Sequence, residues 1–147
     1  MLARKITYKD FNDEERSETF YFNLTESELA KLEYSQKGGL TEWIKRATES
    51  KDGKVILDTF ETIIKATYGV KSLDGRSFVK NDQVFEEFKG TNAYNQLFME
   101  LVTDAQAAAE FISACMPEKM RGKAKEVMEA ELKKVNTDEA VIKKVES

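Results

Sequence analysis

The first two dozen residues alternate between apolar and polar positions, with the period of a half-buried β-strand. Ile6 and Tyr8 stand between polar neighbours, and Phe20, Phe22 and Leu24 alternate along residues 19–24. Residues 10–16 between the two runs are polar apart from Phe11 and typical of a turn, so the pattern predicts an antiparallel β-hairpin. Because a two-stranded hairpin is only marginally stable alone, its apolar face needs a cover. That cover is either the chain's own helices or another copy of the chain.

From residue 25 onward the period changes to that of amphipathic helices. Thr25 and Glu28 have the spacing of a capping box, the reciprocal pair of hydrogen bonds that begins a helix, and Thr103 and Gln106 repeat it. Apolar residues at helical spacing predict successive helices within residues 25–37, 41–51, 56–67, 82–89, 91–102 and 103–116.

Glycine and proline divide these segments. Gly69 is predicted to end the third helix. Asp74 and Gly75 mark a tight turn that fits a very short second hairpin. Pro117 either begins a further helix or ends the sixth. The predicted fold class is therefore mainly α with an N-terminal antiparallel β-hairpin, that is, α+β.

Composition changes after Pro117. Residues 118–147 contain no aromatic residue, and half of these 30 residues are Lys, Arg, Asp or Glu. We expect a compact hairpin and helical core domain over residues 1–117 and a charged, helical C-terminal tail over residues 118–147. The tail keeps a thin apolar stripe that includes Met120, Val127, Met128 and Leu132. The stripe belongs either to a solvated terminal helix or to a surface that docks on a partner, for which methionine is well suited.

Charge and residue usage exclude several functional classes. The net charge is −4 with basic and acidic residues intermixed, which argues against nucleic-acid binding, because that usually needs a basic patch. No apolar run approaches the roughly 20 residues that cross a bilayer, and no signal peptide is evident at the N-terminus. The chain has no histidine, one cysteine and no phosphate-binding glycine loop. We therefore expect no enzyme activity, no metal and no cofactor, and we expect Cys115 to be a small core residue.

Several segments resemble a family of tail assembly chaperones from long-tailed bacteriophages, especially phages of Gram-positive hosts. The resemblance lies in residues 5–25 (KITYKDFNDEERSETFYFNLT), 38–40, 64–69 (IKATYG), 72–78 (SLDGRSF) and 93–112, and it covers roughly residues 3–117. It consists of general likeness and the order of elements, without a catalytic signature.

The resemblance implies a function. Such proteins coat the tape measure protein, keep it soluble while the tail tube assembles around it, and are displaced as tube subunits polymerise. It implies action in the host cytoplasm, absence from the mature virion, and partners that include other copies, a longer frameshifted form and possibly the tail tube protein. The alternatives are a small structural tail or head-tail connector subunit of the virion, or a small regulator that acts on nucleic acid.

Two sets of residues are candidates for binding. For self-association they are Ile6, Tyr8, Phe20 and Phe22, on the hypothesis that the hairpin joins copies edge to edge. Phe20 and Phe22 have the equally simple interpretation that they pack on the chain's own helices. For the client, the candidates are Met120, Val127, Met128 and Leu132 of the tail stripe.

Overall fold

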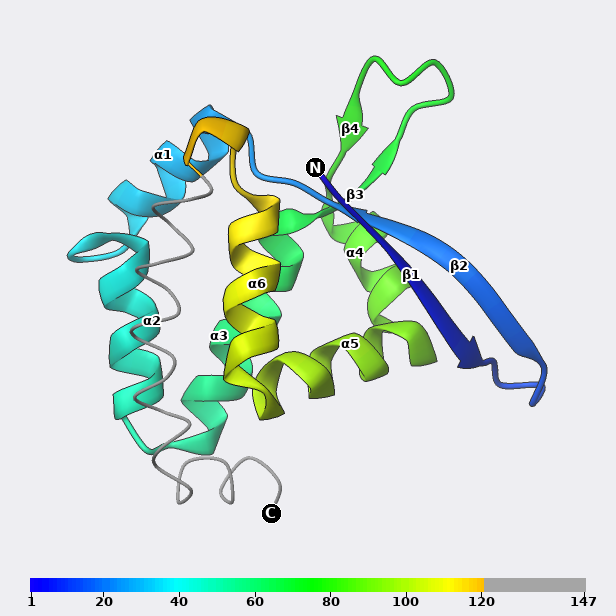
Figure 1. Ribbon diagram of the computed structural model, residues 1–147, viewed down its shortest axis with the longest axis horizontal. Helices are drawn as coiled ribbons and strands as arrows, with labels where there is room; N and C mark the ends of the chain where they lie inside the picture. The colour runs from blue at the N-terminus through cyan, green and yellow to red at the C-terminus, as the bar shows by residue number, and fades with distance from the viewer. Residues whose placement is uncertain (121–147) are drawn as a thin grey trace.

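The computed structural model of the chain describes residues 1–120, apart from the side chains of Thr48 and Lys119. Within these residues the chain forms six α-helices and one small sheet, whose strands contact α4, α5 and α6 (Figure 1), so the predicted fold class is confirmed. The predicted tail over residues 118–147 lies almost wholly outside the described residues. The elements in chain order are β1 (Leu2–Lys9), β2 (Glu15–Phe22), α1 (Glu26–Ser35), α2 (Gly39–Glu49), α3 (Gly53–Thr67), β3 (Tyr68–Lys71), β4 (Phe78–Val79), α4 (Asp82–Lys89), α5 (Asn92–Thr103), α6 (Ala105–Cys115) and the short 3-10 helix η1 (Glu118–Met120).

The sheet unites the two predicted hairpins. Its strand order is β1-β2-β3-β4 with every neighbouring pair antiparallel. The sequence predicts β1–β2 and β3–β4 but not the pairing of β2 with β3, which places Phe22 opposite Tyr68 and Tyr21 opposite Gly69. The N-terminal hairpin is therefore part of a four-stranded sheet and is not a separate unit.

Gly69 does not end α3, contrary to the prediction. The helix ends at Thr67, and Gly69 lies inside β3. A Cβ atom at this position would lie 2.6 Å from Cε2 of Phe78, so the residue has no side chain because the Phe78 ring crosses the strand there. The glycine therefore permits a close approach within the second hairpin and has no role as a helix stop.

Five of the six described helices begin at a side-chain cap, whereas α2 begins after Gly38 without one. Thr25 and Glu28 form the predicted capping box at the start of α1. The predicted box at Thr103 is wrong, because Asp104 caps α6 by accepting a hydrogen bond from the Ala107 N–H at 3.1 Å. The Thr103 hydroxyl instead donates to the Met99 carbonyl inside α5.

One hydrophobic core lies between the sheet and the helices. Its centre is aromatic: Phe22 is fully buried, its ring centroid lies 5.0 Å from that of Phe111, and Tyr68 stacks on Phe88 at 4.2 Å. Cys115 is fully buried at the end of α6, as predicted.

The connection between β2 and α1 is hydrogen-bonded to the ends of two helices. The Asn23 N–H donates to the Thr67 carbonyl at 2.8 Å, and the Leu24 N–H donates to the Cys115 carbonyl at 2.7 Å. These bonds fix the start of α1 against the C-terminal ends of α3 and α6. The position of α1 in turn determines one wall of a surface groove.

Candidate functional site

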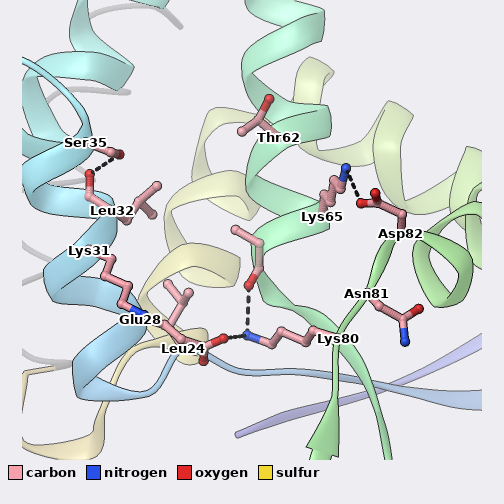
Figure 2. Close-up of a pocket in the computed structure, with 11 residues that line it drawn as sticks. Leu24, Glu28, Lys31, Leu32, Ser35, Thr62, Lys65, Lys80, Asn81 and Asp82 are labelled. Carbon is pink, nitrogen blue, oxygen red and sulfur yellow. Dashed lines mark hydrogen bonds and ion pairs between the residues drawn. The ribbon is translucent and has the colours of Figure 1, made fainter.

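A groove of about 510 Å³ lies between α1, α3 and the residues that join β4 to α4 (Figure 2). Its apolar lining consists of Leu24, Leu32 and Ala66. The remaining lining residues are charged or polar: Glu28, Lys31, Ser35, Thr62, Lys65, Lys80, Asn81 and Asp82. Small-molecule and peptide sites commonly combine an apolar lining with a few polar groups in this way.

Lys80 joins three segments at the base of the groove. Its Nζ donates to the carbonyl oxygens of Asn23 at 2.6 Å and Ala66 at 2.8 Å, and to Glu28 Oε2 at 2.8 Å. Only 16% of the side chain is exposed, so the ammonium has exchanged most of its water for these oxygens. Lys80 is thus a structural support for the groove wall and is not available to a ligand.

Glu28 serves both the capping box and Lys80. It accepts from the Thr25 N–H at 3.0 Å through Oε1 and from Lys80 through Oε2. Partial burial by itself raises the pKa of Glu28, but the hydrogen bonds from Lys80 and Thr25 outweigh it and lower the pKa below its usual value. Glu28 therefore stays ionised as an internal partner.

The rim of the groove carries one cation, Lys31, that has no ion-pair partner among the described residues. Lys65 pairs with Asp82 at 2.9 Å, and both groove carboxylates are thereby engaged by lysines of the same chain. Lys31 lines the groove on α1 and forms no ion pair within the described part of the chain. The groove thus offers an apolar floor and one available positive charge, an arrangement that suits binding and offers no catalytic pair.

A second surface lies on the β3–β4 hairpin, which projects away from the helices in Figure 1. Val70 and Val79 stand opposite each other in the ladder and are 46% and 40% exposed. They continue the sheet face that carries Phe22 and Tyr68 in the core, because side chains two residues apart share a face. At the tip, Leu73 is fully exposed. The apolar face of the sheet therefore extends beyond its helical cover.

A family model described as phage tail assembly chaperone matches residues 1–146. The chain belongs to the phage tail assembly chaperone family. No curated protein and no solved structure was found to match it. Membership in a chaperone family implies a non-enzymatic role in bacteriophage tail assembly.

The chaperone's predicted self-association residues lie against its own helices. Ile6, Tyr8 and Phe22 are buried in the core, and Phe20 is half-buried with its ring 4.9 Å from that of Phe88. The cover that the hairpin needs is therefore supplied within the chain. Edge-to-edge joining of copies stays a prediction, and it would depend on the backbone of β1.

Part of the outer edge of β1 is already engaged by α5. The Thr7 carbonyl accepts from Gln96 Nε2 at 3.1 Å, and the Lys9 carbonyl accepts from Asn92 Nδ2 at 2.9 Å. Strand addition along this half of the edge would have to displace both amides, so a docking strand would meet competition from the chaperone itself.

Of the predicted client-binding residues, Met120 lies in η1 with 42% of its surface exposed. Val127, Met128 and Leu132 lie outside the described residues, and their role stays a prediction. Neither the groove nor Leu73 was predicted from the sequence. The available signal for Leu73 was a leucine set within the polar turn of residues 72–77. No local sequence pattern indicates the groove, because its walls come from segments far apart in the chain.

No helix among residues 1–120 is long and apolar enough to cross a membrane. No group of three or more acidic or cysteine side chains in that range could hold a metal ion.

Proposed function

We propose that this tail assembly chaperone binds the tape measure protein of its phage and keeps it soluble while the tail tube is built. The observation that carries the proposal is the family match over residues 1–146. In this proposal the chaperone acts as an oligomer in the host cytoplasm, meets other copies or a longer frameshifted form, and yields its client to tail tube subunits. It is then absent from the finished virion.

The surface of the chain supports a binding role. Exposed large apolar side chains are present on several elements, among them Leu73 and Phe11 at the two hairpin tips and Met99 and Met120 on helices. Exposed methionine and aromatic residues suit adaptable contacts with apolar segments of a partner. We propose that the tail stripe of Met120, Val127, Met128 and Leu132 contacts the client.

The test is co-expression of the chain with the tape measure protein of the same phage, followed by size exclusion with light scattering. We expect a defined soluble complex, whereas the tape measure protein alone is insoluble. A client that stays insoluble beside well-folded chaperone would contradict the proposal.

The same experiment tests the tail stripe. The double substitution Met128→Glu and Leu132→Glu is expected to lower the recovered client at least tenfold. Gly122→Glu with Ala130→Glu adds the same charge at two positions that helical spacing sets away from the stripe, and this variant is the matched control. Equal recovery with both variants would remove the stripe from the interface while leaving the chaperone function intact. Finding the chain in purified particles would instead favour a structural tail or connector subunit.

A further inference from the structure

We propose that the free half of the β1 edge, residues 3–6, binds an extended acidic segment of another protein, which adds a strand to the sheet beside α5. The inference goes beyond the proposed function, because it names a surface and the chemistry of the segment that the surface accepts. Its test uses a synthetic peptide and needs no client, so it can fail or succeed independently of tape measure binding.

Strand β1 lies at one end of the sheet, so the backbone groups on its outer side have no neighbouring strand. The side-chain amides of α5 bond to the carbonyls of Thr7 and Lys9, which identifies these as outward groups. Backbone groups alternate in direction along a strand, so those of Ala3 and Lys5 also point outward. Nothing within residues 1–120 hydrogen-bonds to Ala3 or Lys5 on that side. Each of the two residues therefore offers one N–H and one C=O to an added strand.

A groove of about 560 Å³ lies between this part of β1 and α5. Ile6, Leu97 and Met99 supply its apolar lining, and Met99 is 45% exposed. Arg4 and Glu100 also line it, but they pair with each other across the groove. Successive side chains of an added strand point to opposite faces, so those that stand opposite Arg4 and Ile6 would reach the groove. An apolar side chain is expected at these positions of the ligand.

The other face of the sheet is basic near Lys5. This lysine stands opposite Thr19 of β2 and forms no ion pair within the described part of the chain. On the same face, the ammonium of Lys71 lies 3.9 Å from the ring centroid of Tyr21. Strand β1 itself contains three basic residues and no acidic one. Because opposite charges facing each other across strands are favourable, the ligand is expected to place an acidic residue opposite Lys5 and to alternate apolar and acidic residues.

The same charges disfavour a second copy of the chain as the occupant. Pairing of two β1 edges through their free halves would bring the basic side chains of both strands together, and like charges in facing positions are destabilising. The edge at the other end of the sheet, β4, contains only Phe78 and Val79. An acidic strand of a different protein meets neither obstacle. A single added strand buries less than the roughly 1,000 Å² of a stable interface, so the binding is expected to be reversible.

The test titrates the chain into a fluorescent peptide of alternating valine and glutamate and follows the anisotropy. The same peptide with lysine in place of glutamate is the charge control. Lys5→Glu reverses the charge that the ligand meets. Lys9→Glu is the matched control, because it makes the same change on the same strand in the half that α5 already engages. Ala3→Pro removes one outward N–H with a residue that edge strands tolerate, and circular dichroism establishes that each variant is folded.

We expect the glutamate peptide to bind and the lysine peptide not to bind. Lys5→Glu should weaken binding about tenfold, because a favourable facing pair becomes a repulsive one. Ala3→Pro should weaken it about fivefold through the loss of one hydrogen bond. Lys9→Glu should change it less than about twofold, because salt screens a charge that is not in contact. Amide hydrogen exchange should show new protection of the Lys5 N–H in the complex and little change at Arg4, whose N–H already faces β2.

Failure of the glutamate peptide to bind would overturn the proposal. So would equal losses for Lys5→Glu and Lys9→Glu, which would indicate attraction by the overall charge of the strand. Protection of the Lys5 N–H in the chain without peptide, lost on dilution, would show that a second copy occupies the edge and would also overturn it.

Discussion

At the scale of single residues, Lys80 shows how a charged side chain can organise an apolar region. Its ammonium donates hydrogen bonds to two carbonyl oxygens, that of Ala66 near the end of α3 and that of Asn23 after β2. The third bond goes to the carboxylate of Glu28. An unpaired buried charge is costly, but here each of the three ammonium protons has an acceptor. The residue therefore stabilises the junction of α1, α3 and the sheet.

Replacing Lys80 by methionine keeps most of the side-chain volume and removes these three bonds. We expect Lys80→Met to lower the free energy of unfolding by about 1–3 kcal/mol, because the two carbonyls and Glu28 lose their partner. The matched control is Lys31→Met on the rim of the same groove, where a change within about 0.5 kcal/mol is expected for an exposed side chain without an ion pair in the described part of the chain. Urea unfolding of both variants gives the comparison, and equal losses would contradict the role assigned to Lys80.

At the scale of elements, most of what the sequence predicts correctly depends on neighbouring residues, whereas the contacts between distant segments are not predicted. The capping box at Thr25 and the alternation along β1 and β2 depend on residues within a few positions of each other, and both are confirmed. The pairing of Phe22 with Tyr68 joins segments far apart in the chain, and no local sequence pattern predicts it. The groove has the same origin, since Leu24, Ala66 and Lys80 meet only when the sheet and helices have assembled.

The error at the start of α6 has a local cause. Thr103 and Asp104 are adjacent residues that can both act as caps, and the spacing to Gln106 favoured Thr103. In the fold Thr103 is the last residue of α5, where its hydroxyl bonds back to Met99, so Asp104 alone is free to cap the next helix.

Substitutions at this boundary distinguish the two caps. Asp104→Ala is expected to lower the free energy of unfolding by about 1 kcal/mol, the usual cost of losing a helix cap. Thr103→Ala should change it by less than about half of that, because an exposed hydroxyl bonded within its own helix contributes little. Thermal unfolding followed by circular dichroism measures both. A larger loss of unfolding free energy for Thr103→Ala than for Asp104→Ala would show that Thr103 is the residue that caps α6.

At the scale of the whole molecule, the described residues share one core that includes side chains from α1 through α6 and from the sheet. Trp43 on α2 packs against this core while remaining half-buried, and it is the only tryptophan of the chain. Because α2 lies on the side of the molecule away from the strands (Figure 1), the fluorescence of Trp43 reports on the packing of that side.

A single core predicts a single cooperative transition. In urea, the fluorescence of Trp43 and the far-ultraviolet circular dichroism of the helices are expected to change together with the same midpoint. If α1 and α2 were held only loosely, the fluorescence midpoint would come at lower urea. Such a separation would show that the groove wall formed by α1 can open while the aromatic core stays intact.

The hydrogen bonds of Asn23 and Leu24 can form only late in the synthesis of the nascent chain. Their acceptors, Thr67 and Cys115, are synthesised well after the hairpin itself. At the usual pace of translation, on the order of 5 to 20 seconds separates Leu24 from Cys115. During that interval β1 and β2 emerge from the ribosome before α5 and α6 are complete. The apolar side of the two strands is therefore not yet covered by these helices. This tail assembly chaperone thus passes through a period in which its own first strands are exposed.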